Sequence, residues 1–237
     1  MADPFTSRRL GATTSFDELV ASVHFDGVAE GRRGAVIVKP EARGVPIVRT
    51  TTAYATPAQH FRGVHDELAH LVGHPFNNAL VEHYTPAYAK MKAHSDQALD
   101  LADDSVIAVY SCYRDAALPS RRLVIEPKES GVSFEVPLDH DSVVMFSLAT
   151  NRRFRHAILL RPQAPDNEWF GITFRASKTF VQFVANQPRV EGEPLTLANE
   201  DQRREFFHYR SRENNETSFA YPEITYTLSE SDRLPPR

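Results

Sequence analysis

Eight short segments follow one another through residues 78–177, and each has the β-branched content or the alternating pattern of a strand. They are NALVEHY, AYAKMKA, SVIAVYSCY, RRLVIEP, VSFEVPL, SVVMFSL, FRHAILL and EWFGITFRAS. The stretches between them are too short for the crossover helices that join parallel strands. The sequence therefore predicts a mainly β fold with flanking helices, either a sandwich or a jelly roll.

The chain on both sides of these segments adds further elements. Residues 46–54 have strand composition, and a helical period that starts at Pro57 places Phe61, Val64, Leu68, Leu71 and Val72 on one face. A second helix is predicted over residues 199–212. We expect an N-terminal extension over 1–45, a possible substrate lid, then a core over 46–185, and a C-terminal helix and tail packed on that core over 186–237.

Four histidines accompany the first predicted helix: His60, His65, His70 and His74. His65 and His70 lack the i, i+4 spacing that a helical metal pair needs, so we expect a solvated face.

The overall charge argues against a general attraction to nucleic acid. The formal net charge is -4 at pH 7 and the sequence pI is about 6.2. The single cysteine, Cys112, cannot form an internal disulfide, and we expect it to be buried and inert. No apolar run approaches the length of a membrane span. We expect a cytoplasmic protein with no membrane partner; the sequence leaves the oligomeric state open.

The tripeptide His94-Ser95-Asp96 is the strongest candidate for a metal site. At the end of a strand, side chains two residues apart project to the same side, so the imidazole and the carboxylate can share one ion. With His156 they would form the two-histidine, one-carboxylate triad that holds non-haem Fe(II). A competitor, Asp139-His140-Asp141, is expected in a solvated turn.

Alternation within the strands predicts a polar interior. In EWFGITFRAS, the aromatic and aliphatic residues Phe170, Ile172 and Phe174 point to one side. The other side carries Trp169, Gly171, Thr173 and Arg175, and in NALVEHY one side carries Leu80, Glu82 and Tyr84. A barrel interior that held these residues beside His94, Asp96 and His156 would be too polar for an ordinary core and would resemble a ligand cavity.

Taken in order, these pieces resemble the AlkB-like branch of the Fe(II)/2-oxoglutarate-dependent dioxygenases over about residues 76–179. The resemblance implies a double-stranded β-helix core, of the jelly-roll or cupin-like kind, and a requirement for Fe(II), 2-oxoglutarate and O2. It implies that His94, Asp96 and His156 ligate iron. The co-substrate would be bound by Arg175, Tyr84 and Thr173.

The chain departs from that family at two positions. Glu82 stands where relatives have asparagine, and Trp169 stands where they have a second arginine. Arg161 is a candidate to complete the co-substrate clamp, and Glu82 and Trp169 are candidate contacts. The cluster of Arg152, Arg153 and Arg155 could bind an acidic substrate. The favoured interpretation is a solvated, charged segment at the start of a strand.

Plainer structural interpretations of the same residues stay open. His94 and Asp96 could be a solvated pair, and His156 a core histidine bonded to a backbone carbonyl. Arg175 could form a structural salt bridge with Glu82.

Three functions follow from these alternatives. We expect a dioxygenase that oxidises a C–H bond of a small molecule. The alternatives are an oxidative demethylase of alkylated nucleic acid and a catalytically silent jelly-roll binding protein.

Overall fold

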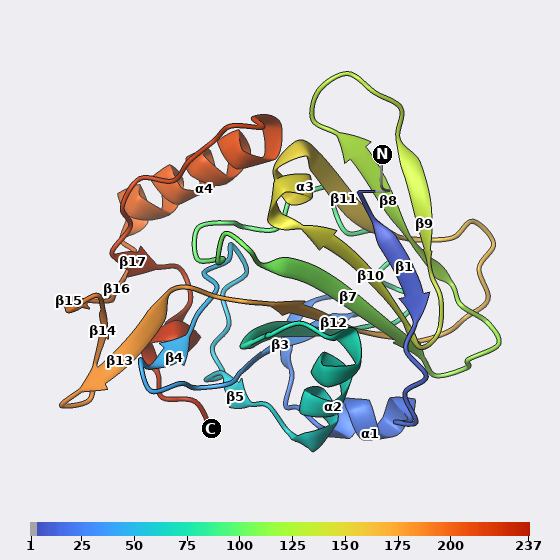
Figure 1. Ribbon diagram of the computed structural model, residues 1–237, viewed down its shortest axis with the longest axis horizontal. Coiled ribbons are helices and arrows are strands. Elements are labelled where there is room, and N and C mark those ends of the chain that lie inside the picture. Colours follow the sequence, from blue (N-terminus) through green and yellow to red (C-terminus); the bar gives the residue numbers. More distant parts are fainter. Residues whose placement is uncertain (1–3) are drawn as a thin grey trace.

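The computed structural model describes residues 4–237 as a mainly β chain with few helices (Figure 1). Its helices are α1 (Phe16–Ala21), α2 (Gly63–Val72), α3 (Leu148–Arg153), α4 (Glu200–Asn215) and the 3-10 turn η1 (Glu230–Arg233). Its longer strands are β3 (Arg32–Val38), β6 (Asn78–Tyr84), β7 (Val106–Tyr113), β8 (Arg121–Pro127), β9 (Phe134–Leu138), β10 (Ser142–Ser147), β11 (Phe154–Leu160), β12 (Trp169–Arg175) and β13 (Phe180–Val184). The shorter strands are β1 (Thr6–Arg9), β2 (Asp26–Ala29), β4 (Val45–Pro46), β5 (Gln59–His60), β14 (Gln187–Val190), β15 (Glu193–Pro194), β16 (Thr196–Leu197) and β17 (Tyr226–Thr227).

Two sheets face each other and form the predicted double-stranded β-helix. The large sheet has the order β1-β10-β7-β12-β6-β3-β2, with β5 paired to β3, and the small sheet has the order β11-β8-β9. Apolar side chains from both sheets share one buried cluster that includes Val109 of β7, Leu123 of β8 and Ile158 of β11. This inner layer holds the barrel together, and the outer face of the large sheet needs separate cover.

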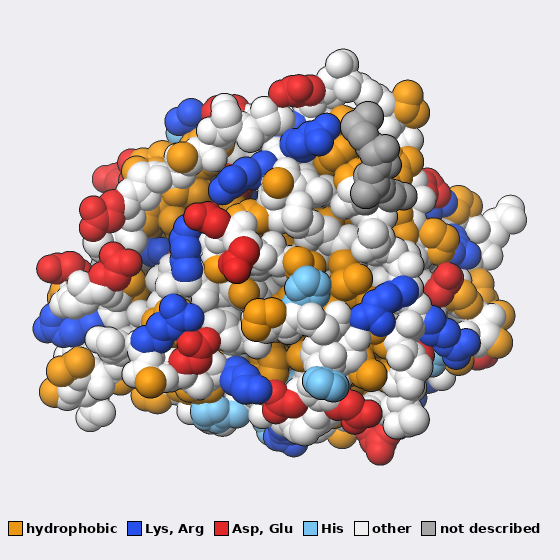
Figure 2. Space-filling view, in the orientation of Figure 1, with side chains coloured by type: hydrophobic (Ala, Val, Ile, Leu, Met, Phe, Trp, Pro, Cys, Tyr) orange, Lys and Arg blue, Asp and Glu red, His pale blue; other side chains and the backbone are white. Residues whose placement is uncertain are grey.

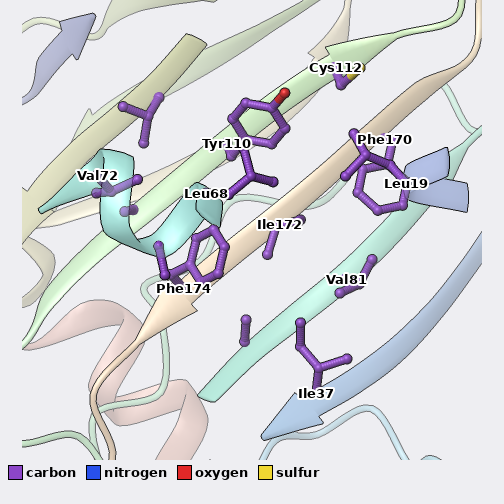
Figure 3. Close-up of a cluster of buried hydrophobic side chains, with 14 of the residues drawn as sticks. Leu19, Ile37, Leu68, Val72, Val81, Tyr110, Cys112, Phe170, Ile172 and Phe174 are labelled. Carbon is purple, nitrogen blue, oxygen red and sulfur yellow. The ribbon is translucent and has the colours of Figure 1, made fainter. Parts of the chain in front are cut away.

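Helices α1 and α2 supply that cover (Figure 3). Leu19 of α1 and Leu68 of α2 pack on the strand residues Phe170, Ile172 and Phe174, which confirms the predicted alternation along β12. Each of these five side chains is fully buried, and a buried leucine or phenylalanine contributes roughly 1.5–3 kcal/mol. The burial fixes which face of β12 turns outward to the helices and which turns inward to the barrel.

The first predicted helix begins later than expected and its histidines differ in burial. Residues Gln59 and His60 pair with β3, so α2 starts at Gly63 and not at Pro57. The expectation of four solvated histidines is wrong for His65, which is fully buried. Its Nε2 lies 2.9 Å from the Ser22 hydroxyl and its Nδ1 accepts the Arg62 backbone N–H at 3.0 Å. Both ring nitrogens of His65 therefore have a hydrogen-bond partner inside the core.

Two of the predicted strands are largely absent. Only Pro46 of residues 46–54 lies in a strand, because the following segment is held by a buried ion pair: Arg49 Nη2 lies 2.7 Å from Asp100 Oδ1. The segment AYAKMKA forms no strand, only an isolated bridge from Lys90 to Leu159. It therefore runs beside β11 without joining a continuous ladder.

The predicted division of the chain at residues 45 and 185 differs from the observed pairing. β1 pairs with β10 and β3 pairs with β6, so the first part of the chain belongs to the large sheet and is no separate extension. Near residue 185, β13 and β14 pair as a hairpin across the proposed boundary. A lid role for residues 1–45 stays a prediction, and residues 1–3 lie outside the described part.

The C-terminal helix lies where it was predicted. Asn199 caps α4: its side chain accepts the Gln202 backbone N–H while the Gln202 side chain accepts the Asn199 N–H. Phe206 of α4 packs with Ile224, Tyr226 and Leu228 of the tail. Among the described helices, none combines the length and the apolar character needed to cross a membrane.

Candidate functional site

A reciprocal backbone bridge brings two distant histidines together. The His94 N–H donates to the His156 carbonyl at 2.9 Å, and the His156 N–H donates to the His94 carbonyl at 2.7 Å. Residues directly opposite each other in an antiparallel pair place their side chains on the same face. The two imidazole rings accordingly lie 4.7 Å apart between centroids.

Asp96 completes a cluster that could hold one metal ion. Its Oδ1 lies 3.7 Å from His94 Nε2 and 3.4 Å from His156 Nε2. One donor atom from each of the three side chains falls within 4.8 Å of the others. Two imidazole nitrogens and one carboxylate oxygen are the donor set of the facial triad that suits Fe(II).

Hydrogen bonds fix the orientation of the donors. The Nδ1 of His94 lies 2.9 Å from the Lys92 carbonyl, so Nδ1–H donates there and Nε2 is left to face Asp96. Arg175 lies on the other side of Asp96, with Nε at 2.7 Å and Nη2 at 2.6 Å from Oδ2. Both contacts engage one carboxylate oxygen, and Oδ1 remains directed at the histidines.

The charge states suit metal binding. Burial, together with the neighbouring His156, lowers the pKa of His94 to about 3, so this imidazole is neutral near pH 7. Burial alone would raise the pKa of Asp96, but the Arg175 guanidinium and the His156 contact outweigh it and hold that pKa well below its usual range. A neutral imidazole and an ionised carboxylate are the forms that bind a metal.

Side chains of α3 and α4 hydrogen-bond to the backbone of Ser95 and Asp96, next to two members of the metal cluster. Asn151 of α3 accepts the Asp96 N–H at 2.8 Å and donates to the Asp96 carbonyl at 2.7 Å. Asn214 of α4 accepts the Ser95 N–H at 2.8 Å, and Arg210 donates to the Ser95 carbonyl at 2.8 Å. This segment is therefore clamped from both sides by helices distant in sequence.

The cluster lies in a cavity of about 730 Å³. Its inner wall includes Thr173, Arg175 and Glu82, and its outer wall includes residues 50–52 and, on α4, Phe207 and Asn214. Sites for small ligands and cofactors typically measure roughly 300–1,000 Å³. The volume is therefore ordinary for a cofactor with a small substrate.

Glu82 lines the cavity, as expected of a candidate contact, whereas Tyr84 and Trp169 are not among its lining residues. Glu82 pairs with Arg32, at 2.6 Å between Oε1 and Nη2, so the suggested salt bridge between Arg175 and Glu82 is wrong. Tyr84 and Trp169 are buried and pack together at 4.8 Å between ring centroids.

The remaining arginine candidates and the competing metal motif stay away from the cavity. Arg161 and Arg152 do not line it, and Arg152 is half exposed near Asp103. Asp139-His140-Asp141 does form a turn, as predicted, but Asp141 is buried and accepts the Gly11 and Ala12 N–H groups. Its carboxylate is therefore structural and not solvated.

Sequence reasoning missed two arginines of the barrel interior. Arg32 comes from β3, in the stretch expected to be an extension. Arg121 is fully buried at the start of β8, and its Nε and Nη1 have no hydrogen-bond partner among the described residues. The alternation Arg121, Leu123, Ile125 in RRLVIEP was the available signal, because it turns the arginine inward with two apolar residues.

The unpaired donors of the interior fit an anionic co-substrate. The Tyr84 hydroxyl and Trp169 Nε1 are buried without a partner, as are two nitrogens of Arg121. Buried donors of this kind normally have an acceptor. The metal cluster together with these donors fits a ferrous ion and a dicarboxylate, the two components predicted from the motifs.

A family match covers the part of the chain that holds the metal cluster. Residues 40–179, more than half of the chain, match the family described as the 2OG-Fe(II) oxygenase superfamily. Among curated proteins, no sequence matches the chain. A solved structure of OsALKBH1 aligns at a TM-score of 0.49 and 11% identity, covering 74% of this chain and 99% of its own. A Pseudomonas putida prolyl-4-hydroxylase aligns at 0.45 and 14% identity, covering 74% of this chain and 94% of its own.

The family match spans His94, Asp96, His156 and Arg175, and it includes β11 and β12, which carry His156 and Arg175. Members of this superfamily use Fe(II), 2-oxoglutarate and O2, as the resemblance implied. The chain belongs to the 2OG-Fe(II) oxygenase superfamily, the broader group that contains the AlkB-like branch.

Proposed function

We propose that the protein is an Fe(II)- and 2-oxoglutarate-dependent dioxygenase that oxidises a C–H bond of a small molecule, with His94, Asp96 and His156 as its iron ligands. The observation that carries the proposal is the placement of all three side chains on the wall of one cavity of about 730 Å³. The cavity closes around the cluster with α4 on one side and residues 50–52 on another.

The metal would be held by the two Nε2 atoms and by Asp96 Oδ1. When bound, iron with 2-oxoglutarate and O2 supplies the oxidising power of this superfamily, which couples decarboxylation of the keto acid to oxidation of a substrate C–H bond. Arg175 fixes the carboxylate through Oδ2 and keeps it ionised. A metal ion held by these three side chains would keep its other coordination positions open for further ligands.

The walls of the cavity position the substrate and exclude water. Leu80, Val109, Leu123 and Ile158 give the cavity an apolar side next to the metal cluster. On the opposite side, Phe207 of α4 contributes an aromatic ring that is 48% exposed. An apolar wall facing one ring suits a compact substrate with an apolar portion.

A small-molecule substrate fits the charge of the chain better than nucleic acid does. The net charge is -4, and the face in Figure 2 shows acidic and basic side chains interspersed with no continuous basic field. Binding of a polyanion depends on neutralising its phosphates with lysine and arginine. The single cysteine, which cannot form an internal disulfide, suits the predicted cytoplasmic location.

The test separates the three functions. Anaerobic protein is loaded with Fe(II) and 2-oxoglutarate, and charge-transfer absorption is recorded before O2 and a panel of small molecules are added. We expect the absorption band and substrate-dependent release of succinate, both lost in His94→Ala. Formaldehyde release from a methylated oligonucleotide would favour the demethylase instead. The catalytically silent binding protein would give neither band nor succinate.

A further inference from the structure

The Arg121 guanidinium is a buried cation that forms no ion pair with a described residue; the charge of Glu82 acts on it from farther away, and that carboxylate is paired with Arg32. The side chain is fully buried, and only Nη2 has an acceptor, the Thr85 carbonyl at 2.9 Å. Nε and Nη1 donate to no described group, and no acidic residue of the described chain forms an ion pair with it. Burying an unpaired guanidinium is costly, so a fold that keeps one implies an absent anion.

Two more unpaired donors lie against this guanidinium. Its Cζ is 4.9 Å from the centroid of the Tyr84 ring, and the Tyr84 ring is 4.8 Å from that of Trp169. Trp169 Nε1 is buried and has no hydrogen-bond partner among the described residues, and the buried Tyr84 hydroxyl faces the Glu82 side chain without ordinary hydrogen-bond geometry. We call Arg121, Tyr84 and Trp169 the donor cluster. It offers one positive charge and several N–H and O–H groups, and its members have no acidic side chain.

The donor cluster adjoins the metal-site cavity. Tyr84 packs on Tyr88, a wall residue of the cavity, at 4.7 Å between centroids. Arg121 pairs in register with Leu160, four residues along β11 from His156. Four residues of strand span roughly 13 Å, and an arginine side chain with a short diacid can bridge that separation.

The other interior cations are already engaged. Arg175 directs Nε and Nη2 to Asp96, and its Nη1 donates to the Thr173 carbonyl at 3.3 Å. Arg32 pairs with Glu82. Arg121 alone among these three combines full burial with unused donors.

We propose that Arg121 binds the distal carboxylate of 2-oxoglutarate, with Tyr84 as a second donor, while the keto end of that molecule lies at the metal cluster. The inference rests on the proposed function. It places the anchor on β8, in the sheet that faces the one carrying Arg175. A guanidinium that binds a carboxylate through two nitrogens gives strong, oriented recognition.

The test compares a chelator that has a distal carboxylate with one that lacks it. Protein loaded with Mn(II), which binds these donor types without turnover, is titrated calorimetrically with 2-oxoglutarate and with oxalate. Arg121→Met is the variant. Arg122→Met is the matched control, because the neighbouring Arg122 points outward to Glu135 at 3.3 Å.

We expect Arg121→Met to weaken 2-oxoglutarate binding about 100-fold, the size of a lost charge-assisted pair, with oxalate affinity unchanged. Unchanged oxalate binding also shows that the variant folds. Arg121→Lys should recover part of the affinity, since it restores the charge. In wild-type protein, 2-oxobutyrate, which has no distal carboxylate, should bind as weakly as 2-oxoglutarate binds to Arg121→Met.

Equal 2-oxoglutarate affinity in wild-type protein, Arg121→Met and Arg122→Met would overturn the assignment of Arg121 and leave the metal and keto-acid site standing. If Arg121→Met loses oxalate as well, the residue supports the fold and the anchor proposal also fails. If wild-type protein binds neither chelator, the proposed function itself is wrong. The three failures therefore differ in their readout.

Discussion

Replacing Asn214 by alanine tests whether α4 positions the metal ligands. Its side-chain oxygen accepts the N–H of Ser95, which lies between His94 and Asp96 and is fully buried. The substitution removes that acceptor and leaves both ligand side chains in place. The neighbouring Asn215 provides a matched control: it also lines the cavity, but its amide donates to Ser211 and accepts from Arg155, and within the described part of the chain it makes no hydrogen bond to residues 94–96.

The size of the effect follows from the lost hydrogen bond. A buried N–H without a partner costs roughly 1–3 kcal/mol, and residues that orient metal ligands typically contribute about 10- to 100-fold in metal affinity. Asn214 lines the cavity, so water can reach the freed N–H and reduce the cost. We therefore expect Asn214→Ala to weaken metal binding by about tenfold, the lower end of that range.

The assay is a competitive titration of Fe(II), or of Mn(II) followed by its magnetic resonance signal, against a chelator of known affinity. Thermal unfolding of the metal-free proteins reports any general loss of stability. If Asn214→Ala and Asn215→Ala bind metal within twofold of each other, the helix does not position the ligands. A loss of thermal stability without a change in affinity would refute the reasoning equally.

Three further predictions concern the fold around the site. Burial lowers the pKa of His65 to about 4, so the unfolded chain binds the extra proton below pH 6.5 and stability falls toward acid; the loss of unfolding free energy in urea between pH 7.5 and pH 5 should be about 2 kcal/mol smaller in His65→Gln than in wild-type protein, and an equal loss in both would contradict the buried neutral imidazole. Burial raises the pKa of Cys112 to about 12, so a thiol reagent should modify it only after denaturation, and rapid native labelling would contradict its buried position. Gly171→Ala should destabilise the fold by about 2 kcal/mol in urea, because its Cβ would collide with the Trp169 ring; a wild-type midpoint would show that the ring can move.

The sequence predicted the two faces of the strands and the approach of His94 to Asp96, because both features depend on local patterns. Alternation over residues 169–175 correctly assigned Phe170, Ile172 and Phe174 to the apolar layer. The two-residue spacing of His94 and Asp96 predicted that they lie on one side, and the structure brings them to His156. The alternation along β12 is short-range geometry, so the order of residues is enough to predict it. The approach of His156 is long-range, because a backbone bridge joins it to His94, and it was predicted from the resemblance to a known family.

Features that depend on long-range partners could not be predicted in the same way. The sequence predicted a solvated His65, but in the fold its ring contacts the hydroxyl of Ser22, 43 residues away. Arg175 was expected to bind the co-substrate, but its guanidinium donates to Asp96, 79 residues away. The place of β3 between β2 and β6 follows from pairing that no local pattern encodes.

The most direct test of the account is the stoichiometry of iron in purified, anaerobically reconstituted protein. We predict one Fe(II) per chain in wild-type protein and in His70→Ala, whose side chain is exposed on α2. We predict that His94→Ala and His156→Ala lose that iron while remaining folded by circular dichroism. One tightly bound iron in either of those two variants would contradict the claim that these side chains hold a single ferrous ion.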